Sequence, residues 1–340
     1  MARKRFVAVM ILFLFLAPVK GVFGAWANPD LLYTVDQAEK IVGNPKWVIL
    51  DCRDQANYEK GHLPGAVILG KASAPKILRD GTARVFQDLT KYEKILGQAG
   101  LGNDKEILVY SDLKSRLMID AFLTFWVLEY LGHKKVHLLD GGLDAWVKAG
   151  KKVETAPSKI TPALFTVTAD RTKLASSEEV FEFATGREKN RQLVDCRTRE
   201  EFDGYDIRAL RGGHIPKTTK NVPHFTFFEL KKDEKTGKEI PTGFLSEAAV
   251  NKALEGLDKS KRTFFLCQTG TRSTFGYFVS RLSGFSNPAN YDDSWLVWAN
   301  NFYKNYPVEN EQWIDFSRIT ELENKVKELE NRIKTLEVQK

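Results

Sequence analysis

The feature that most constrains the fold of this chain is an internal repeat, in which the same short motifs occur twice in the same order. The four matching pairs are Val48–Arg53 with Gln192–Arg197, Gly61–Pro64 with Gly213–Pro216, Ile107–Tyr110 with Phe264–Leu266, and Leu139–Trp146 with Tyr291–Trp298. Single hydrophobic cores rarely grow far beyond ~250 residues, and this chain has 340. Two copies of one structural unit are therefore expected.

Each copy alternates two kinds of segment. Apolar runs of strand length, such as Trp47–Leu50 and Thr263–Leu266, are followed by longer segments of helical period. Leu117–Tyr130 is apolar on nearly all sides, which suits a helix buried beside a sheet, and Thr274–Leu282 also has the character of a helix. The alternation predicts an α/β fold in which each unit has a mainly parallel sheet flanked by helices.

The repeat and the composition together divide the chain into five parts. These are a signal peptide over residues 1–27, a first unit over 28–155, a Lys- and Pro-containing linker over 156–169, a second unit over 170–310, and a coiled coil over 317–338. The charged stretch over residues 231–239 within the second unit predicts an exposed hairpin or loop.

The N-terminus has the layout of a secretory signal peptide. Three cations at positions 3–5 precede an apolar run over residues 6–19, and small residues follow, so that cleavage after Gly24 or after Ala27 is expected. The alternative is a membrane anchor, but the run is interrupted by Lys20 and falls short of the ~20 apolar residues needed to cross a bilayer. An exported, periplasmic or otherwise extracytoplasmic protein is the prediction.

The net charge gives little reason to expect a nucleic-acid ligand. The whole chain carries 51 cations and 44 anions, a net charge of +7. Removal of residues 1–27 subtracts four cations and no anions, which leaves 47 against 44, a net charge of +3. The mature chain has no long run of Lys or Arg, so a function in nucleic-acid binding is set aside.

The chain has three cysteines, an odd number, so at least one thiol has no partner within the chain. Cys52 and Cys196 occupy equivalent places, each between an Asp and an Arg just after an apolar strand, and burial is their expected role. The neighbouring ion pairs, Asp51 with Arg53 and Asp195 with Arg197, are expected to anchor the loop at each strand end.

Cys267 is different, because it opens the segment Cys267–Ser273 between an apolar strand and a helix. A strand-to-helix turn of this kind aims backbone N–H groups and the positive end of the helix at one point. Both favour the thiolate form and hold an approaching anion. Arg272 adds a fixed fork of hydrogen-bond donors for an oxyanion.

A cysteine, four residues and an arginine in such a loop resemble the active-site loop of rhodaneses. The Asp-x-Arg, Gly-His-Ile-Pro and Tyr-Asp-x-Ser-Trp segments of the second unit match the same family, and the resemblance extends over about residues 30–308. It implies two tandem rhodanese-like domains and a thiosulfate sulfurtransferase. Cys267 would be the catalytic residue, and the substrate-binding residues would be Gln268, Thr269, Gly270, Thr271, Arg272 and Ser273.

The mechanism that this resemblance implies has two steps. The Cys267 thiolate attacks the outer sulfur of thiosulfate or a related donor, sulfite leaves, and a persulfide remains on the cysteine. A thiophilic acceptor, cyanide or a thiol, then removes the sulfur. Arg208 and Arg211, in the surface excursion over residues 203–212, are additional candidates for contacts to a sulfonate group, with solvated surface charge as the alternative.

The loop also bears on the competing substrate classes. Phosphatases that use a cysteine carry one more residue between cysteine and arginine, and a smaller cradle suits a single sulfur atom better than a phosphoryl group. The Cys-Gln-x-Gly-x-Arg form resembles thiosulfate-using members of the family more than the mercaptopyruvate-using type. Mercaptopyruvate is accordingly the less favoured donor.

The first unit is expected to be noncatalytic. Its equivalent loop, Ser111–Arg116, has the same spacing but a serine in place of the nucleophile, and a serine hydroxyl is too weakly acidic to replace a thiolate. Asp112 would also oppose an anionic donor. His62 and His214 are expected to be hydrogen-bonded turn residues, and neither a metal nor a cofactor is expected.

The tail has a heptad pattern, with apolar residues spaced alternately by three and four from Ile319 to Leu336. Ile or Val at the a positions with Leu at the d positions favours a parallel dimer. A trimer, or a single helix folded back on its own domain, is the alternative. A homo-oligomer is therefore expected, together with a small-molecule sulfur donor and acceptor.

Two functions are consistent with these features. The first is an enzyme that moves sulfane sulfur from thiosulfate through a Cys267 persulfide. The second is a persulfide carrier or binding module that acts mainly through protein partners, an alternative that rests on the coiled coil.

Overall fold

The computed structural model describes residues 26–82, 84–234, 236–237, 239–301 and 305–338. The predicted signal peptide over residues 1–27 therefore lies almost entirely outside the described residues. In the part of the chain that is described, no helix is both long and apolar enough to span a membrane.

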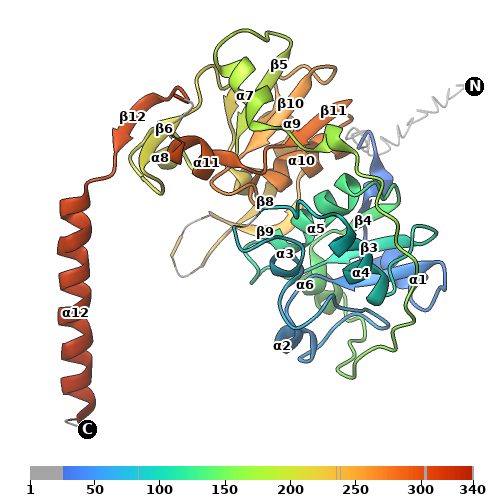
Figure 1. Ribbon diagram of the computed structural model, residues 1–340. Helices are drawn as coiled ribbons and strands as arrows, with labels where there is room; N and C mark the ends of the chain where they lie inside the picture. Colours follow the sequence, from blue (N-terminus) through green and yellow to red (C-terminus); the bar gives the residue numbers. More distant parts are fainter. Residues whose placement is uncertain (1–25, 83, 235, 238, 302–304, 339–340) are drawn as a thin grey trace, which may run out of the picture.

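The first unit is built on a parallel sheet with the strand order β1-β4-β3-β2 (Figure 1). Its strands are β1 (Leu32–Tyr33), β2 (Trp47–Asp51), β3 (Glu106–Tyr110) and β4 (Val136–Leu139). Its helices are α1 (Val35–Ile41), α2 (Gln55–Tyr58), α3 (Ala74–Ile77), α4 (Thr90–Gln98), α5 (Ile119–Tyr130) and α6 (Gly142–Lys148), preceded by the short 3-10 helix η1 (Pro29–Leu31).

The second unit repeats this plan, with a parallel sheet in the order β11-β10-β5-β7. The strands of this sheet are β5 (Arg191–Asp195), β7 (Lys220–Asn221), β10 (Arg262–Leu266) and β11 (Asn287–Asn290). Its helices are α7 (Ser177–Ala184), α8 (Arg199–Phe202), α9 (Glu247–Leu254), α10 (Ser273–Leu282) and α11 (Ser294–Asn300), with the 3-10 helices η2 (Arg171–Lys173) and η3 (His224–Phe227). The predicted α/β fold with two units of the same kind is confirmed.

Two antiparallel pairs are added to the second unit. The surface excursion ends in β6 (Arg211–His214), which pairs with β12 (Glu309–Trp313). The charged stretch predicted as a hairpin or loop is the hairpin of β8 (Phe228–Lys232) and β9 (Glu239–Leu245).

Local sequence signals explain where several of these helices begin. Thr34, Ser176 and Thr198 each accept a hydrogen bond from the backbone three residues on, while a Gln or Glu side chain at that position bonds back. These capping boxes satisfy N–H groups that have no partner inside the helix. The third of them starts α8 and so places Glu201, which belongs to the candidate site.

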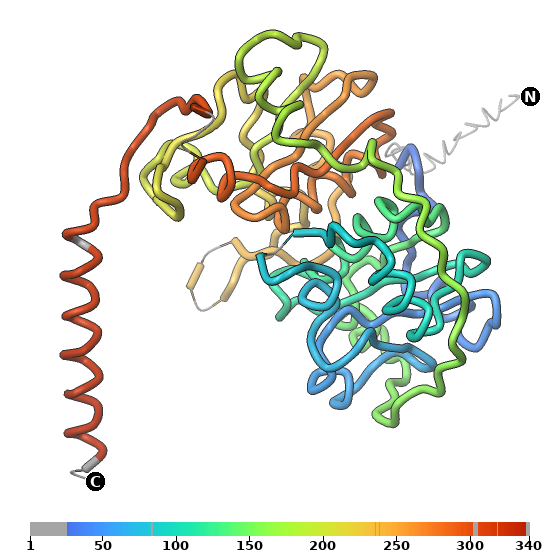
Figure 2. The backbone as a smooth tube through the Cα atoms, in the orientation of Figure 1, coloured from blue at the N-terminus to red at the C-terminus, as the bar shows by residue number. Residues whose placement is uncertain are grey.

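One of the hydrophobic core clusters extends across both units. Helix α5 of the first unit and α10 of the second pack against each other, and a single core cluster includes Phe122 and Phe125 together with Phe275 and Phe278. The linker over residues 156–169 runs along the first unit before the second begins, as the tube shows (Figure 2), and Phe165 within it is buried. The two units are therefore packed against each other and are not independent domains joined by an extended linker.

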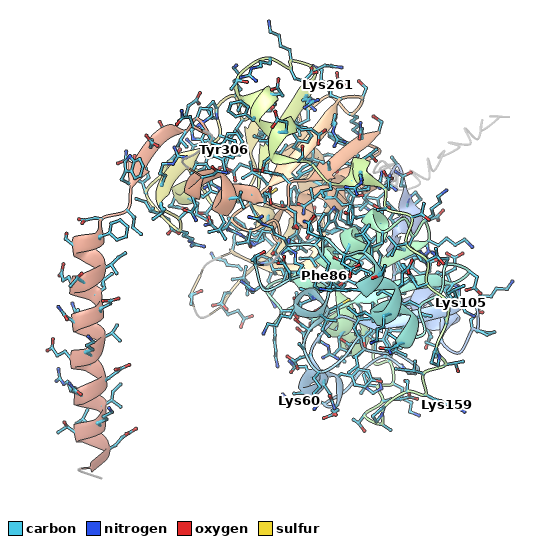
Figure 3. All side chains as sticks on the ribbon, in the orientation of Figure 1. Lys60, Phe86, Lys105, Lys159, Lys261 and Tyr306 are labelled. Carbon is cyan, nitrogen blue, oxygen red and sulfur yellow. The ribbon has the colours of Figure 1, made fainter. Side chains whose placement is uncertain are left out.

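The last helix, α12 (Phe316–Val338), projects away from both units with its side chains in the open (Figures 1 and 3). The apolar residues of its heptad pattern are exposed in consequence: Leu322, Val326, Leu329, Ile333 and Leu336 are each at least half accessible. The chain thus has the helix that was predicted, and the helix does not fold back on its own domain.

Candidate active site

Cys267 lies immediately after the central strand β10, and α10 begins six residues later. Its backbone is fixed on both sides, because Cys267 N donates to Ser294 Oγ at 3.0 Å and Trp295 N donates to Cys267 O at 3.0 Å. The Tyr291–Trp298 motif, which sequence comparison of the two units had singled out without a role, thus holds the start of the loop. The residue is fully buried, so its thiol is less open than the sequence suggests.

Gly270 gives the loop its turn. Its φ is +70°, a conformation that side-chain-bearing residues rarely adopt, and a Cβ there would lie 2.6 Å from both Asp292 O and Asp292 Oδ1. Asn290 Nδ2 also donates to Gly270 O at 2.9 Å. Only glycine fits this position, and the close approach of the 290–292 backbone keeps the loop curled.

The loop presents a run of unused donors. Within the described part of the chain, the backbone N–H groups from Gln268 to Ser273 donate to no other protein group. Such a run of N–H groups at the start of a helix is an anion site, because the donors point inward and the helix end is positive. This is the arrangement that a persulfide or a donor anion at Cys267 requires.

The other predicted loop residues surround this opening. Gln268 Nε2 donates to Arg208 O at 2.8 Å, and the Thr269 and Thr271 hydroxyl oxygens lie 3.4 Å apart. Gln268, Thr269 and Thr271 are partly exposed, so they form the part of the loop that a donor meets first. Ser273 is buried, with its Oγ 3.7 Å from Cys267 Sγ and 2.6 Å from Asn290 Oδ1.

Arg272 is already engaged by a carboxylate. Its Nη1 and Nη2 donate to the two oxygens of Glu201 at 2.6 and 2.7 Å. Burial alone would raise the pKa of Glu201, but the hydrogen bonds and charge of Arg272 outweigh it and lower that pKa to about 2. Arg272 thus contributes a compensated charge beside the thiol, and the fork expected to face an oxyanion is turned toward Glu201.

The two further arginine candidates differ in their environment. Arg208 is half-exposed at the edge of the loop, 3.6 Å from Glu201 and 2.5 Å from Asp206. Its guanidinium is thus near two carboxylates, and its side chain stays half-accessible at the edge of the loop.

Arg211 is buried, and its guanidinium donates to Ala299 O, Trp298 O and Tyr306 O at 3.0 to 3.2 Å and to Glu311 at 2.9 Å. These contacts hold the Arg211 guanidinium inside the second unit, where its role is structural. We therefore correct the expectation that it contacts a sulfonate.

A residue of the first unit reaches the loop, which the sequence did not indicate. Arg79 Nη1 donates to Thr271 Oγ1 at 2.8 Å, and Arg79 Nη2 forms a buried ion pair with Asp292. Val85 N donates to the other oxygen of Asp292 at 3.0 Å. No local signal could reveal this contact, because Arg79 and Thr271 are 192 positions apart.

His224, at the start of η3, is a second residue that sequence analysis missed. Its backbone N–H donates to Cys196 O at 3.2 Å, and its ring lies 5.5 Å from that of Phe275. Burial and the charge of Arg272 lower the pKa of His224 to about 4, so the imidazole is neutral at neutral pH. None of the repeated motifs includes His224, so no sequence signal pointed to it.

In the matching loop of the first unit, carboxylates of the same unit accept hydrogen bonds from the loop. Asp112 Oδ1 accepts from Ser115 N at 2.9 Å and from Ser115 Oγ at 2.7 Å, and Asp144 accepts from Leu113 N at 2.7 Å. Two of the N–H groups that correspond to open ones in the second unit, those of Leu113 and Ser115, are here bonded to the chain's own carboxylates, and Leu117 N donates to Leu113 O at 3.1 Å. Together with Ser111 in place of the cysteine, this explains physically why the first loop is unsuited to an anion.

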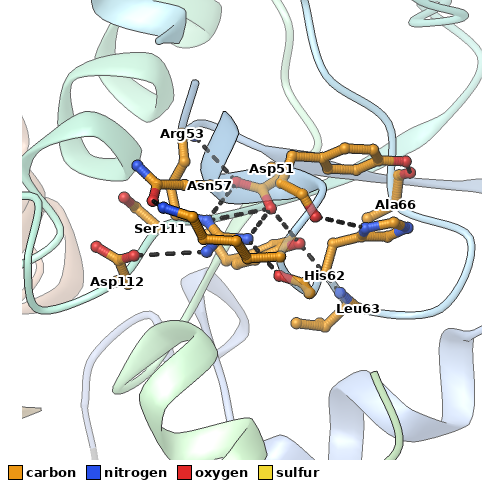
Figure 4. Close-up of polar contacts among 12 residues, drawn as sticks. Asp51, Arg53, Asn57, His62, Leu63, Ala66, Ser111 and Asp112 are labelled. Atoms are coloured by element: carbon orange, nitrogen blue, oxygen red, sulfur yellow. Dashed lines mark hydrogen bonds and ion pairs between the residues drawn. The ribbon is translucent and has the colours of Figure 1, made fainter. Parts of the chain in front are cut away.

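The Asp-x-Arg ion pairs anchor both strand ends, as predicted. Arg53 bonds Asp51, approaching to 2.5 Å, and also faces Asp112 at 3.5 Å (Figure 4). Arg197 bonds Asp195 at 2.6 Å in the second unit. Each of these arginines also donates to the backbone of a glycine at 2.8 Å, so it ties the strand end to the Gly-His segment.

The equivalent histidines and cysteines behave as structural residues. His62 Nδ1 lies 2.9 Å from Tyr58 O and His214 Nδ1 lies 3.0 Å from Phe202 O, with each ring stacked on the neighbouring aromatic ring. Cys52 and Cys196 are fully buried. Among the described residues no three His, Cys, Asp or Glu side chains gather as a metal site would need.

Comparison with known proteins bears on the family. The family model described as Rhodanese-like domain matches residues 34–149 and 181–301, one match in each unit. A thiosulfate sulfurtransferase of Corynebacterium glutamicum is 31% identical over 291 residues, which cover 82% of this chain and 90% of that protein. A sulfur carrier protein of Thermus thermophilus is 29% identical over 287 residues, covering 81% of this chain and 95% of the carrier.

Solved structures support the same architecture. The anaerobic ergothioneine biosynthesis enzyme from Chlorobium limicola, in complex with trimethyl histidine, superposes with a TM-score of 0.67. The match covers 84% of this chain and 71% of that enzyme, at 18% identity. At that identity the likeness concerns the fold alone.

Proposed function

Because the chain belongs to the rhodanese-like domain family and is a sulfurtransferase of that type, we propose that it transfers sulfane sulfur from thiosulfate through a persulfide on Cys267. The acceptor is cyanide or a thiol. The observation that carries the proposal is the buried cysteine at the end of β10, enclosed by a run of N–H groups without protein partners.

The first step forms one sulfur–sulfur bond and breaks another. The Cys267 thiolate attacks the outer sulfur of thiosulfate, and sulfite leaves with the electron pair of the cleaved bond. The open N–H groups of the loop receive the negative charge of the resulting persulfide, where preorganised donors are most effective in a site that excludes water. Cyanide then attacks the outer persulfide sulfur, and the thiolate is regenerated as thiocyanate leaves.

The neutral hydrogen-bond donors of the loop are proposed to bind the reactive end of the sulfur donor, and Arg208 is proposed to contact its sulfonate end. Gln268, Thr269 and Thr271 are neutral, and the charge of Arg272 is balanced by Glu201. Thiosulfate therefore meets hydrogen-bond donors with little net charge, and Arg208 at the rim supplies a cation for its sulfonate end. A comparison of thiosulfate with mercaptopyruvate at one cyanide concentration tests this preference.

The assignment of Cys267 is tested by the Cys267→Ser variant. We expect thiocyanate formation from thiosulfate and cyanide to fall at least 10³-fold, because an alcohol at this position cannot carry the sulfur. Mass spectrometry of the wild-type protein after thiosulfate treatment should find about 32 Da, one sulfur atom, added to the peptide that contains Cys267. Cys52→Ala, a change at a buried cysteine of the first unit, is the control and should keep full turnover. Undiminished turnover of Cys267→Ser would refute the proposal.

A sulfur-carrier role is the second candidate, favoured by the similarity to the Thermus thermophilus carrier and by the exposed apolar residues of α12. In that case thiosulfate would load Cys267 readily, but cyanide would unload it slowly. Single-turnover measurements of the two half-reactions distinguish the roles. A Cys267 persulfide that forms within the mixing time of the experiment and then persists in the presence of cyanide indicates a carrier. Rapid loss of the persulfide sulfur to cyanide indicates an enzyme.

A further inference from the structure

Cys196 and Cys267 occupy the same register on neighbouring strands. Strands β5 and β10 are parallel, with Val194 opposite Phe265 and Asp195 opposite Leu266, and the ladder continues one step further because Cys196 N donates to Leu266 O at 2.8 Å. The next pair along this ladder is Cys196 and Cys267.

The two side chains also point to the same face of the sheet. Successive residues of a strand alternate between faces, and Val194 and Phe265 belong to the same core cluster as both cysteines. Leu193 and Phe264, one residue earlier on each strand, belong to a different cluster.

Helix α10 covers both sulfur atoms. Ser273 Oγ lies 3.7 Å from Cys267 Sγ, and a Cβ built on Gly276 would lie 3.0 Å from Cys196 Sγ. Ser273 and Gly276 are one turn apart on the same helix face. Neighbouring strands are spaced by about 4.8 Å, within the Cα separation of about 4.4 to 6.8 Å that disulfides accept.

The first unit has the same cysteine but lacks its partner. Cys52 N donates to Tyr110 O at 2.9 Å, so Cys52 is paired with Ser111 in the equivalent register. The chain therefore contains one pair that can be oxidised and one matched pair that cannot.

Burial determines what chemistry is open to these thiols. Both cysteines of the second unit are fully buried, so neither can pair with a cysteine of another molecule, and only small reagents can reach Cys267. Burial also raises the pKa of the Cys196 thiol well above its usual range. Cys196 is therefore protonated at neutral pH and does not compete with sulfur acceptors during turnover.

We propose that Cys196 is a resolving cysteine, which forms a disulfide with Cys267 after a hydroperoxide has oxidised the catalytic thiol. In the first step the Cys267 thiolate attacks one oxygen of hydrogen peroxide, the O–O bond breaks, and a sulfenic acid and hydroxide are formed. In the second step Cys196 sulfur attacks the sulfenic sulfur, the S–O bond breaks, and the proton of Cys196 leaves with the hydroxyl group as water. Both electrons taken up by the peroxide thus come from the pair of thiols.

The product is an inactive but recoverable enzyme. A disulfide removes the nucleophile, and a dithiol reductant restores both thiols by exchange. Without a partner, the sulfenic acid advances to sulfinic acid, which such reductants do not reverse. The proposal goes beyond sulfur transfer, because it requires only a reactive Cys267 and holds whichever sulfur donor the protein uses.

Tryptic mapping of the full-length protein after treatment with a slight excess of hydrogen peroxide tests the proposal directly. The three cysteines fall in three separate tryptic peptides, residues 47–53, 192–197 and 263–272. We expect the second and third to be joined, with a loss of about 2 Da for the two hydrogens removed. The first should stay unlinked and be alkylated. Sulfur transfer should be lost with the same time course as the link forms, and dithiothreitol should restore at least four-fifths of it.

Two variants make the test decisive. Cys196→Ala should be as active as the wild type before peroxide treatment, but should then lose activity irreversibly, with two oxygens added to Cys267. Because that addition and a persulfide both amount to about 32 Da, the two are separated by dithiothreitol, which removes only the persulfide. Cys52→Ala should behave as the wild type throughout, and Cys196→Ser replaces Cys196→Ala if the smaller side chain impairs folding.

Two results would overturn the proposal. One is over-oxidation of wild-type Cys267 with no link between the two peptides. The other is equal recovery of Cys196→Ala and the wild type under dithiothreitol. Neither result depends on thiosulfate: a protein that forms the link but never transfers sulfur from thiosulfate would contradict the proposed function and leave this inference standing.

Discussion

In the proposed mechanism the anion at Cys267 is stabilised mainly by backbone N–H groups, because the guanidinium of Arg272 is bound to Glu201. Arg272 is bound by both oxygens of Glu201, which is itself buried and ordered by the capping box of α8. Because Glu201 balances the charge of Arg272, this arginine can order the loop without binding the product sulfite tightly. The open N–H groups carry no net charge, and so bind an anion while allowing a charged product to leave.

The Glu201–Arg272 pair makes stability depend on pH in a definite direction. The pKa of Glu201 is lowered from 4.5 to about 2, so folding favours its ionised form. The stabilisation is complete above about pH 4.5 and is lost as the pH falls toward about 2, and amounts to about 3 kcal/mol in the free energy of unfolding. Glu201→Gln should therefore be about 3 kcal/mol less stable than the wild type near neutral pH.

Urea denaturation at a series of pH values measures this difference. The gap between the wild type and Glu201→Gln should narrow steadily below about pH 4.5. A gap of constant size down to about pH 2.5 would show that the carboxylate charge has no part in the effect. Glu200→Gln, an exposed change on the same short helix, serves as the control and should leave the stability curve unchanged.

At the scale of elements, the conformation of the Cys267 loop depends on Gly270, a position that no other residue type fits. In Gly270→Ala the new methyl group would meet the backbone and side chain of Asp292, on top of the usual cost of about 1 kcal/mol for alanine at positive φ. We expect kcat/KM for thiosulfate to fall at least 10-fold, because the N–H groups would no longer converge on the sulfur.

Gly43→Ala provides a matched control for this prediction. Gly43 has a φ of +75°, close to that of Gly270, but a Cβ there would meet nothing within 4 Å. The control should lose about 1 kcal/mol of stability and no activity. If Gly270→Ala kept wild-type kcat/KM, the curl of the loop would not matter for catalysis.

The helices and strands could largely be predicted from the sequence, but the contacts between them could not. The helix predicted over Thr274–Leu282 begins one residue earlier, at Ser273, and the strand predicted over Thr263–Leu266 begins one residue earlier, at Arg262. Hydrophobic periodicity locates such segments because each must bury one face, a requirement local to the segment.

The candidate site divides in the same way. Cys267 and its loop could be identified from spacing, because one short segment contains them. Three other features of the site could not be predicted from the sequence. They are the ion pair of Arg272 with Glu201, the hydrogen bonds of Arg211 to backbone carbonyls, and the contact of Arg79 from the first unit with Thr271. Each of these depends on side chains that meet only after distant segments have packed, and no local pattern encodes such a meeting.

At the scale of the whole molecule, the exposed apolar face of α12 is best explained by a second copy of the chain. We propose a parallel two-stranded coiled coil, in which Ile319, Val326 and Ile333 take the a positions and the intervening leucines the d positions. The first turns of α12 lie beside Tyr205–Ile207 of the second unit, whereas the rest of the helix projects away from both units (Figure 1).

Leu329→Lys should disrupt that coiled coil, because it places a charge at the centre of the buried face. Light scattering after size-exclusion chromatography should then give the mass of one chain, while the wild type gives twice that mass. Asn331→Lys adds the same charge to the opposite face of the helix and should remain dimeric. A wild-type protein that runs as a single chain at all concentrations would rule out the dimer, and a mass of three chains would favour the trimer.

The contact of Arg79 with the catalytic loop has a consequence for how such a duplicated gene can change. A unit without a cysteine nucleophile in its loop would be expected to change freely, yet here the first unit supplies the counter-ion for Asp292 and part of the core that covers α10. Natural selection on sulfur chemistry must therefore act on residues that never meet sulfur. The first unit thus supports the Cys267 loop of the second unit through Arg79 and through the shared core.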